Sequence, residues 1–393
     1  MTGIRLLNVV PTLLCGGTEN HFMTLARSLD AARFDLRFAC LRKWGPFVDE
    51  LSERRIPLVE YPVATFRSLK AVVQQARLAR DIKRHAVDIV HTYSFYGNVF
   101  AVPPGRISAP VVIASIRDRG PYLTAMQRRV QRHVCRFADC ILVNAEAVRQ
   151  WLLADGYDAS KIVIIPNGVD LGRFNGVDRA AARRSLGVSD STKLVGVVSR
   201  LSRLKGIEDF LLAASMVASR MDDVRFVIVG EQSPINDTAY LDELSELAQT
   251  LKVADKVVFT GLRSDVPDLM SALDVSVMPS LNEALSNVLL ESMAAGNAVV
   301  ATNVGGTSEA LRDGVNGVLV PPSRPDLIAA TIERLLNAPS QARELGIAAR
   351  KTIEDRFSLD RMVNATESLY DRLLSSKRRR VAAPSFAQAS EGK

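Results

Sequence analysis

Residues 276–296, SVMPSLNEALSNVLLESMAAG, contain the pattern of a short strand, a polar loop and a helix in immediate succession. The apolar run at the start stops at Pro279, and a loop of mostly polar residues follows at 280–283. The remainder is rich in Leu, Ala, Met and Glu and ends at Gly296, a common C-terminal stop for a helix. A strand that leads directly into a helix is typical of parallel α/β sheets.

The start of this helix is a predicted anion site. A helix leaves its first backbone N–H groups without partners inside the helix, and the helix dipole adds a partial positive charge there. In this chain the groups belong to Leu285, Ser286, Asn287 and Val288. They predict a site for a phosphate or diphosphate.

Two carboxylates accompany the anion site, Glu283 in the loop and Glu291 in the helix. Asn287 and Glu291 are four residues apart and share a helix face. With the diphosphate on the N–H groups, one carboxylate can bind ribose hydroxyls and the other can bind sugar hydroxyls. The pattern therefore indicates a sugar-nucleotide site. The alternative is a surface Glu beside a capped amphipathic helix in an ordinary α/β domain.

Strand-like runs alternate with helical runs along the chain, which predicts parallel sheets with helices on both faces. Two such sets in series predict two Rossmann-like domains, whose ligands bind at the carboxyl ends of the strands. The expected strands lie near 4–10, 34–41, 56–60, 87–92, 111–115, 139–143 and 161–165, and then near 194–199, 224–229, 256–260, 274–278, 298–302 and 317–320.

Two cations, Arg200 and Lys205, follow the expected strand at 194–199. Lys supplies a point charge and Arg a planar fork, so the pair suits a diphosphate and can neutralise it as it leaves. The alternative is an ordinary basic loop, since Arg203 lies between them.

Several of these segments resemble one family. The two glutamates with seven residues between them, within NEALSNVLLESMAAG, resemble the donor-site motif of retaining glycosyltransferases of family 4, the glycosyl transferases group 1. The R-x4-K element at 200–205 and the GGTSE segment at 305–309 resemble elements of the same family, and with 283–291 between them they occur in the family's order. PNGVD at 166–170 resembles the segment that joins the family's two domains. The resemblance implies the GT-B fold: two Rossmann-like domains that face each other across a cleft, with a last helix that crosses back to the first domain.

The resemblance also implies roles for individual residues. Tyr93 stands where many relatives have the second His of a His-x-His pair, so His91 is expected either on the acceptor side or as a structural residue at a strand end. Thr18 is expected to cap the helix after the first strand. The expected catalytic residues are Arg200, Lys205 and Glu283; the donor-binding residues are Gly17, Gly230, Thr260, Leu262, Leu285, Ser286, Asn287, Val288 and Glu291; and the acceptor-side residues are His91, Tyr93 and Arg117. Glu309 is expected either to support the site or to cap a helix start.

The domain boundaries follow from the same features. Residues 1–170 are expected to form the acceptor-binding domain, completed by a returning helix at 358–376, and 171–357 the sugar-nucleotide domain. The tail 377–393 is basic and then small and polar, so we expect it to be disordered.

Composition supports a cytosolic protein that works without nucleic acid. The chain has 393 residues, 47% hydrophobic, with a net charge of +7 and four scattered cysteines that suit a reducing compartment. No nucleic-acid-binding signature accompanies the positive charge.

Residues 122–136 form a basic amphipathic pattern, and we hypothesise that this helix, with Arg128, Arg129 and Arg132, docks on the inner face of the plasma membrane. The alternative is a helix that buries its apolar stripe.

The resemblance implies a retaining, metal-independent transfer of a sugar from a nucleoside-diphosphate-sugar to a glycan or polyprenyl-linked acceptor, in cell-surface or exopolysaccharide biosynthesis. The sugar nucleotide is then a co-substrate, and no cofactor is expected. Two alternatives stay open: a sugar-nucleotide epimerase on the same two-domain fold, and a non-catalytic sugar-nucleotide-binding subunit of a polysaccharide assembly complex.

Overall fold

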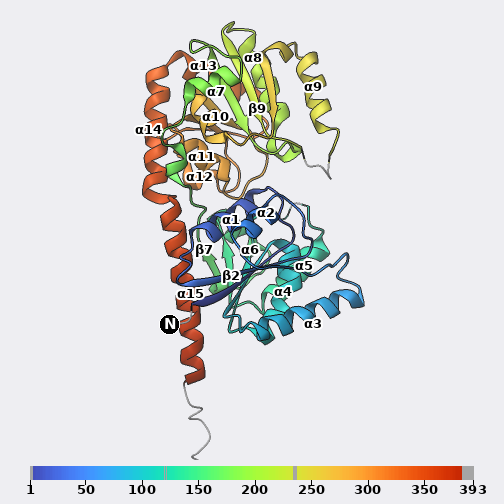
Figure 1. The fold of residues 1–393 in the computed structure, drawn as a ribbon. Coiled ribbons are helices and arrows are strands. Elements are labelled where there is room, and N and C mark those ends of the chain that lie inside the picture. Colours follow the sequence, from blue (N-terminus) through green and yellow to red (C-terminus); the bar gives the residue numbers. More distant parts are fainter. Residues whose placement is uncertain (1–2, 119, 121, 233–236, 383–393) are drawn as a thin grey trace, which may run out of the picture. The chain divides into compact units, whose positions relative to one another are not determined.

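The structure is a computed structural model that describes residues 3–118, 120, 122–232 and 237–382. The chain forms two compact units (Figure 1). The N-terminal unit comprises the residues up to Asn144, Val148–Ile165 and the described residues from Val363, and the C-terminal unit comprises Ala145–Ala147 and Pro166–Met362. The predicted boundaries at 170 and 358 thus lie within five residues of the places where the chain changes units.

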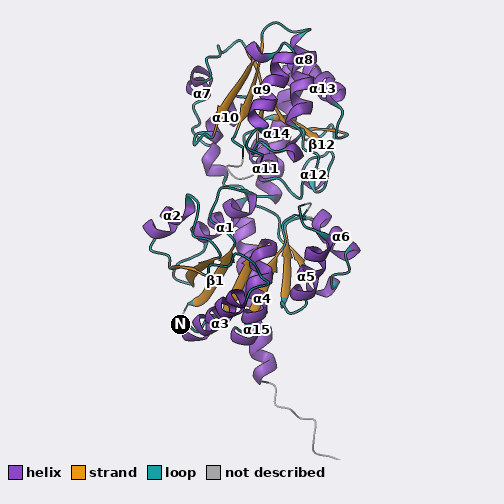
Figure 2. Cartoon of the chain, turned by 90° about the vertical axis from the view of Figure 1, so that its right-hand side faces the viewer, coloured by secondary structure: helices purple, strands orange, loops and turns teal. Residues whose placement is uncertain are grey.

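The N-terminal unit is built on a seven-stranded parallel sheet in the order β3-β2-β1-β4-β5-β6-β7. β1 pairs with β2 from Ile4 opposite Phe34 to Val10 opposite Cys40, and with β4 on its other side. Helices cover both faces of the sheet (Figure 2). The strands are β1 (Ile4–Val10), β2 (Phe34–Cys40), β3 (Leu58–Glu60), β4 (Ile89–Tyr93), β5 (Val111–Ser115), β6 (Cys140–Val143) and β7 (Ile162–Ile164).

Alternate side chains of each strand point to opposite faces of this sheet. On one face, α3 and α4 bury Leu78 and Phe100 against Val9 of β1. On the other, α1 and α2 pack Phe22 and Phe47 in the cluster that contains Val10. The helices are α1 (Gly17–Ser28), α2 (Phe47–Glu53), α3 (Leu69–Arg84), α4 (Ser94–Ser108), α5 (Ala125–Cys135), α6 (Glu146–Ala154) and the 3-10 turn η1 (Ala159–Lys161).

The C-terminal unit has a six-stranded parallel sheet in the order β10-β9-β8-β11-β12-β13. The strands are β8 (Lys193–Val198), β9 (Val224–Val229), β10 (Val257–Gly261), β11 (Val275–Met278), β12 (Ala298–Thr302) and β13 (Val318–Val320). The helices are η2 (Leu171–Phe174), α7 (Arg179–Ser185), η3 (Arg203–Lys205), α8 (Ile207–Ala218), α9 (Tyr240–Thr250), η4 (Ala254–Lys256), α10 (Val266–Ala272), α11 (Asn287–Ala294), α12 (Thr307–Ala310), α13 (Pro325–Asn337), α14 (Pro339–Arg356) and α15 (Leu359–Ala382).

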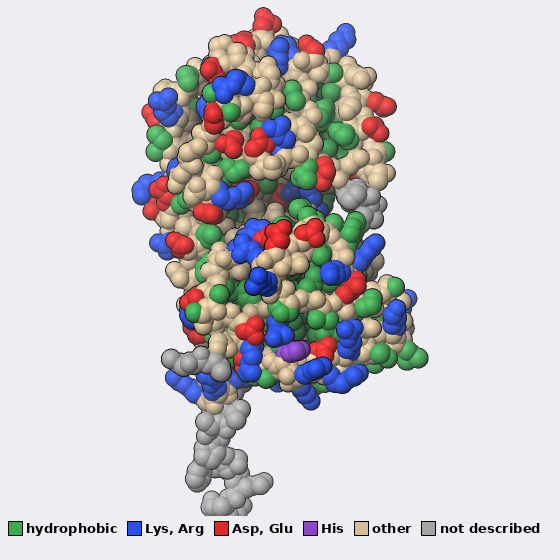
Figure 3. Space-filling view, viewed as in Figure 1, with side chains coloured by type: hydrophobic (Ala, Val, Ile, Leu, Met, Phe, Trp, Pro, Cys, Tyr) green, Lys and Arg blue, Asp and Glu red, His purple; other side chains and the backbone are tan. Residues whose placement is uncertain are grey.

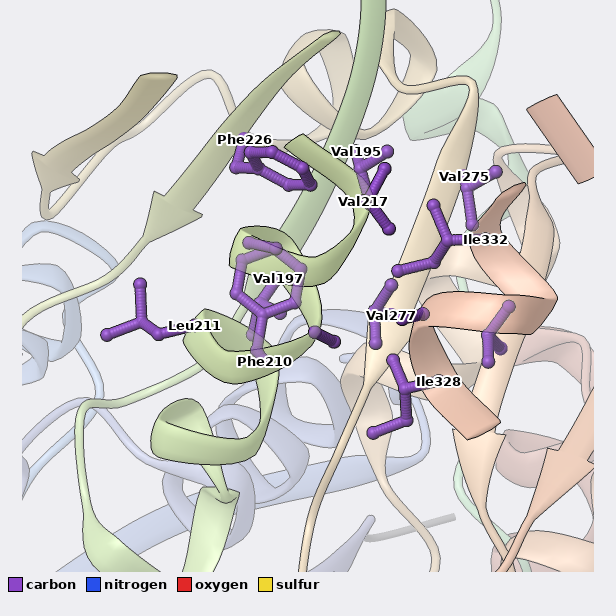
Figure 4. Close-up of a cluster of buried hydrophobic side chains, with 14 of the residues drawn as sticks. Val195, Val197, Phe210, Leu211, Val217, Phe226, Val275, Val277, Ile328 and Ile332 are labelled. Atoms are coloured by element: carbon purple, nitrogen blue, oxygen red, sulfur yellow. The ribbon is translucent and has the colours of Figure 1, made fainter. Parts of the chain in front are cut away.

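The main core of this unit lies between the sheet and helices α8 and α13. Phe210 of α8 meets Phe226 of β9 edge to face, with ring centroids 6.0 Å apart. Val275 and Val277 of β11 and Ile332 of α13 belong to the same buried cluster (Figure 4). A second cluster, with α7 and α10, covers the opposite face. Because both faces of the sheet are buried, its strands appear in the sequence as continuous apolar runs and not as alternating apolar and polar residues.

The prediction of two parallel α/β domains is confirmed, because every expected strand forms and each sheet is parallel throughout. The expected return of the last helix also occurs, since α15 belongs to the N-terminal unit from Val363 onward. Tyr370 of α15 is fully buried there, and its ring meets Phe34 of β2.

Three local predictions are wrong. α15 continues to Ala382, so residues 377–382 are helical; Lys377 has an acidic partner in the unit, since its Nζ lies 2.5 Å from Asp139 Oδ1. The remainder of the predicted tail, 383–393, lies outside the described residues. Thr18 does not cap α1, which begins one residue earlier with Gly16 as its N-cap and no side-chain hydrogen bond. His91 lies inside β4 and not at its end, because the strand continues to Tyr93.

Candidate sugar-nucleotide site

The predicted donor residues of the C-terminal unit lie on loops at the carboxyl ends of four neighbouring strands. Backbone hydrogen bonds join these loops: Ser199 N to Val229 O at 2.9 Å, and Gly230 N to Gly261 O at 3.0 Å. Leu281 N donates to Leu204 O at 2.9 Å, which joins the loop after β8 to the loop after β11. Segments 200–205 and 280–291 therefore form one surface.

Gly206 brings the cationic loop close to β11. Its φ of 62° is left-handed, and a Cβ at this position would lie 2.2 Å from the carbonyl oxygen of Pro279. Only glycine accepts both the conformation and the approach. The turn η3 ends at Lys205 and α8 begins at Ile207, so this glycine sets where Lys205 points.

Lys205 and Glu283 form a direct ion pair, Nζ to Oε1. The same carboxylate oxygen accepts a hydrogen bond from Ser280 Oγ at 2.9 Å. The side chains are 22% and 11% exposed, so the pair is largely withdrawn from water yet reachable from the surface. Two of the three predicted catalytic residues, Lys205 and Glu283, thus neutralise each other's charge. The Ser280 hydroxyl, which was not among the predicted site residues, holds Glu283 in place.

The start of α11 has the geometry of an anion site. Ser286 is the N-cap, and its hydroxyl accepts from Leu289 N at 3.4 Å. The N–H groups of Leu285, Ser286 and Val288 have no hydrogen-bond partner among the residues that the structure describes. The predicted donors therefore lack partners within the described residues, and they directly follow the loop that carries Glu283, although Leu285 and Ser286 themselves are only 4% and 7% exposed.

Asn167 holds this helix start in place. Its Nδ2 donates to Leu285 O at 3.0 Å and to Asn287 Oδ1 at 2.5 Å. Asn167 is 4% exposed, so it holds the start of α11 from the buried side of the site. Asn167 is not among the predicted site residues, although it lies in the PNGVD segment that resembles the family.

Glu291 lies on the first turns of α11 and pairs with Arg173, whose Nη1 is 2.9 Å from Glu291 Oε1. Burial raises the pKa of Glu291, and the neighbouring Arg173 opposes that rise. The guanidinium therefore favours the ionised carboxylate, the form that accepts hydrogen bonds from hydroxyl groups. Arg173 is a second residue whose position at this site was not foreseen.

The two arginines of the cationic loop differ in their surroundings. Arg203 donates to Glu243 at 2.7 Å and lies 4.9 Å from the ring centroid of Tyr240, so α9 already holds it. Arg200 is exposed and forms no ion pair with any residue of the described chain. Of the two, Arg200 is therefore the one whose charge is available to a ligand.

The remaining predicted donor residues form the edge of the same surface. Gly230 has φ of 139°, and a Cβ there would lie 1.9 Å from Ser199 O, so the loops after β8 and β9 touch only because this residue is glycine. Thr260 Oγ1 donates to Gly261 O at 3.0 Å. Leu262 is 63% exposed and open to contact with a ligand.

The segment after β12 supports the loop that carries Glu283. Gly306 N donates to Ala284 O at 2.6 Å, and a Cβ on Gly306 would lie 2.3 Å from that oxygen. Glu309 accepts hydrogen bonds at 2.8 Å from the backbone N–H groups of Glu146 and Ala147, at the start of α6. Glu309 is thus a carboxylate at a helix start, and a role of Glu309 in supporting the donor site stays a prediction.

Gly17, His91, Tyr93 and Arg117 belong to the N-terminal unit. Gly17 is the first residue of α1. His91 is fully buried, with Nδ1 2.8 Å from Tyr370 Oη, and Tyr93 is fully buried and stacks on it at 4.3 Å. Burial, followed by the charge of Arg117, lowers the pKa of His91 to about 3, so the ring is neutral at pH 7.

This network gives His91 and Tyr93 partners within the N-terminal unit. Nε2 of His91 lies 2.7 Å from Ser115 Oγ, so both ring nitrogens have a hydroxyl partner. Burial lowers the pKa of Arg117 to about 10, and Tyr93 and Asp118 oppose that shift. A role of these residues toward an acceptor stays a prediction. Within the described ranges, no group of three or more His, Cys, Asp or Glu side chains could hold a metal ion.

Two family models match this chain. The model of Glycosyltransferase Family 4 matches residues 15–173, and the model of Glycosyl transferases group 1 matches residues 178–352. The D-inositol 3-phosphate glycosyltransferase of Mycolicibacterium gilvum is 34% identical over 306 residues, which cover 74% of this chain and 67% of that protein. The protein of the same name from Segniliparus rotundus is 37% identical over 267 residues, 67% of this chain and 57% of the relative.

Solved structures share the fold. HepE from Anabaena, crystallised in complex with UDP, superposes with a TM-score of 0.84 at 23% identity, over 94% of this chain and 100% of that one. Sucrose-phosphate synthase from Thermosynechococcus elongatus gives a TM-score of 0.79 at 21% identity, over 95% and 100% of the two chains.

Proposed function

The chain belongs to the glycosyl transferases group 1, and on this premise we propose that it moves a sugar, with retention of anomeric configuration, from a nucleoside-diphosphate-sugar to a hydroxyl group of a glycan or lipid-linked acceptor. The observation that carries the proposal is the Lys205–Glu283 ion pair beside the open start of α11. It combines a cation and backbone donors for a diphosphate with a carboxylate for hydroxyl groups.

In this proposal the diphosphate binds the N–H groups at the start of α11 and the side chains of Arg200 and Lys205. The diphosphate takes over from Glu283 as the partner of Lys205, which releases the carboxylate to accept hydrogen bonds from the donor sugar. Glu291, whose carboxylate form the neighbouring Arg173 favours, binds the ribose hydroxyls. Lys205 thus exchanges one anionic partner for another, and Glu283 exchanges its ion pair for hydrogen bonds from neutral sugar hydroxyls.

The reaction breaks the bond between the anomeric carbon and the diphosphate oxygen and forms a bond to the acceptor oxygen. The acceptor proton leaves with the departing phosphate oxygen, so that atoms and charge balance. Charge grows on the diphosphate as its bond breaks. In this proposal the N–H groups of α11, Arg200 and Lys205 stabilise that charge, and the reaction uses no metal or further cofactor. We place the activity in the cytosol, in the synthesis of cell-surface or exported polysaccharide.

A donor screen tests the proposal. Purified protein is incubated with a panel of UDP-, GDP- and ADP-sugars, and thermal shift and release of nucleoside diphosphate are measured with and without alcohol acceptors. The anomeric configuration of the product is read by proton NMR, and each assay is repeated with and without a chelator. A transferase releases the diphosphate and retains configuration, whereas conversion of the sugar nucleotide alone identifies an epimerase. Binding without turnover on any acceptor identifies a non-catalytic subunit.

A further inference from the structure

The helices on the two faces of the N-terminal sheet differ in charge. Helices α3, α4 and α5 together hold nine Lys and Arg residues and one acidic residue, Asp81. Helices α1 and α2, on the other face, hold one Arg and four Asp or Glu residues. Figure 3 shows Lys and Arg side chains gathered over the part of this unit where α3 lies in Figure 1. Among these five helices, the positive charge is thus concentrated on one side of the sheet.

The basic face also exposes apolar side chains at the starts of its helices. Leu69, Val72 and Val73 lie in the first turns of α3 and are 85%, 58% and 59% exposed. Their spacing puts them on one side of the helix. Tyr96 at the start of α4 and Met126 at the start of α5 are 44% and 61% exposed. Helices that connect parallel strands begin at the carboxyl edge of the sheet, so these side chains lie along one edge.

Aromatic contacts join the starts of the three helices. Phe66, just before α3, stacks on Tyr96 with ring centroids 6.1 Å apart. Phe66 also packs against the buried cluster of Phe95, Val99 and Leu123, which links α4 to the residues just before α5. The exposed apolar side chains are therefore mounted on one packed support and do not belong to separate mobile segments.

Basic side chains follow the apolar turns along α3 and lie on α5. Lys70, Arg80, Lys83, Arg84 and Arg129 form no ion pair within the part of the chain that the structure describes. A helix with an exposed apolar turn and unpaired cations beside it has the composition of a helix that lies in a bilayer interface. Anionic lipid headgroups would supply the negative charges that these basic side chains lack within the protein.

The helix that the sequence singled out contributes less than expected. Arg128 donates to Leu123 O at 2.7 Å and Arg132 donates to Asp155 O at 2.6 Å, so both guanidinium groups are used inside the unit. The alternative, a buried apolar stripe on α5, is only partly met, because Met126 and Val130 of that stripe are 61% and 38% exposed. The expected membrane contact therefore moves from the arginines of α5 to the start of α3.

We propose that the N-terminal unit binds the surface of an anionic phospholipid bilayer through its α3–α5 face, with the first turns of α3 inserted between the headgroups. This goes beyond sugar transfer, because the surface is defined by exposure and charge and not by the donor site. The α3–α5 face is defined here by Leu69, Val72, Val73, Tyr96 and Met126 with Lys70, Arg80, Lys83, Arg84 and Arg129.

The test is flotation of the full-length protein with vesicles of phosphatidylcholine alone and of phosphatidylcholine with about one third phosphatidylglycerol. We expect binding only to the anionic vesicles, weakened by salt because each Lys or Arg near the surface acts through screened attraction. The apolar variant carries Leu69→Ser, Val72→Ser and Val73→Ser. The matched control is Ile347→Ser, which changes a side chain that is 63% exposed on α14.

The apolar variant and a variant with Arg80→Gln, Lys83→Gln and Arg84→Gln should each bind anionic vesicles at least about tenfold more weakly, while Ile347→Ser binds like the parent. Unchanged thermal midpoints show that the exposed substitutions leave the fold intact. Failure of the parent to float with anionic vesicles, equal binding by all variants, or a self-association that the apolar variant abolishes would overturn the proposal. Donor turnover in detergent-free buffer is measured separately, so that loss of membrane binding is not confused with loss of transfer.

Discussion

Replacing Gly206 with alanine adds one methyl group to the turn that carries Lys205. The new Cβ would lie 2.2 Å from the carbonyl oxygen of Pro279, far inside the separation of about 3.5 Å at which heavy atoms pack. The turn or the end of β11 must move to relieve the overlap. Either movement separates Lys205 from Glu283, because the two residues flank this contact.

The magnitude follows from two contributions. A left-handed conformation costs an L-residue about 1–2 kcal/mol. Overpacking at a contact without free space adds about 1–3 kcal/mol. Gly206→Ala should therefore lower the free energy of unfolding by about 2–5 kcal/mol.

Gly314→Ala is the matched control in the same unit. Its φ of 69° is close to that of Gly206, yet nothing lies within 4 Å of the added Cβ. It should lose only the conformational contribution of about 1–2 kcal/mol. The difference between the two variants isolates the contact with Pro279.

The assay combines urea unfolding of both variants with the rate of sugar transfer or donor hydrolysis. Gly206→Ala should lower the rate at least about tenfold, which corresponds to about 1.4 kcal/mol of lost transition-state stabilisation. Gly314→Ala should keep the parental rate. Equal losses of stability in the two variants, with activity retained in both, would show that this turn does not position Lys205.

The site and its supports yield further expectations. Lys205→Ala should reduce transfer at least about a hundredfold with an unchanged circular dichroism spectrum, since charge on the leaving diphosphate loses its cation; a normal rate would remove Lys205 from the reaction. Glu283→Ala should chiefly lower kcat, whereas Glu291→Ala should chiefly weaken binding of the nucleoside diphosphate in calorimetry, and the reverse pattern would exchange their roles. Burial raises the pKa of Glu291 and Arg173 lowers it, so Arg173→Ala should raise that pKa further. Binding needs the carboxylate form and is lost as the pH falls through this pKa, so the variant should lose affinity at a higher pH than the parent; coincident pH profiles would contradict the assignment. Glu309→Ala removes the acceptor for two N–H groups of α6 and should lower the free energy of unfolding by about 0.5–2 kcal/mol in urea, whereas an unchanged midpoint would make that cap dispensable.

The elements of this fold were predictable because their signal is local. Each buried strand, such as Val111–Ser115, is an apolar run bounded by polar residues, and parallel sheets bury both faces of such runs. The strand, loop and helix of the candidate site were predictable for a related reason: Glu283, Ser286 and Glu291 lie within one short stretch, and the helix start follows from its composition.

The supports of the site could not be predicted, because they join distant segments. Asn167 reaches Leu285 across 118 positions, and Arg173 reaches Glu291 across the same number. Arg173 and Phe174 follow the PNGVD segment as they do in the resembled family, but the sequence there does not indicate which side chain Arg173 contacts. A side-chain partner so far away becomes visible only when the sheet places both segments at one edge.

The errors at α1 and α15 have physical causes as well. Thr18 has the chemistry of a cap, but the two preceding glycines allow the helix to start earlier without one. The basic residues from Lys377 suggest a solvated tail by composition alone. Asp139 supplies a counterion from β6 and its flanks, and the helix continues past the predicted end.

The placement of α15 has a consequence for biosynthesis. The N-terminal unit is the first to leave the ribosome, yet its core includes Tyr370, a residue made after the whole C-terminal unit. Until then His91 lacks one of its hydroxyl partners, and the apolar surface beside Phe34 stays open to water. The N-terminal unit must therefore stay partly folded, without α15, while the C-terminal unit is synthesised. We expect chaperones to engage it longest in that interval, and release of residue 370 to be the event that ends it.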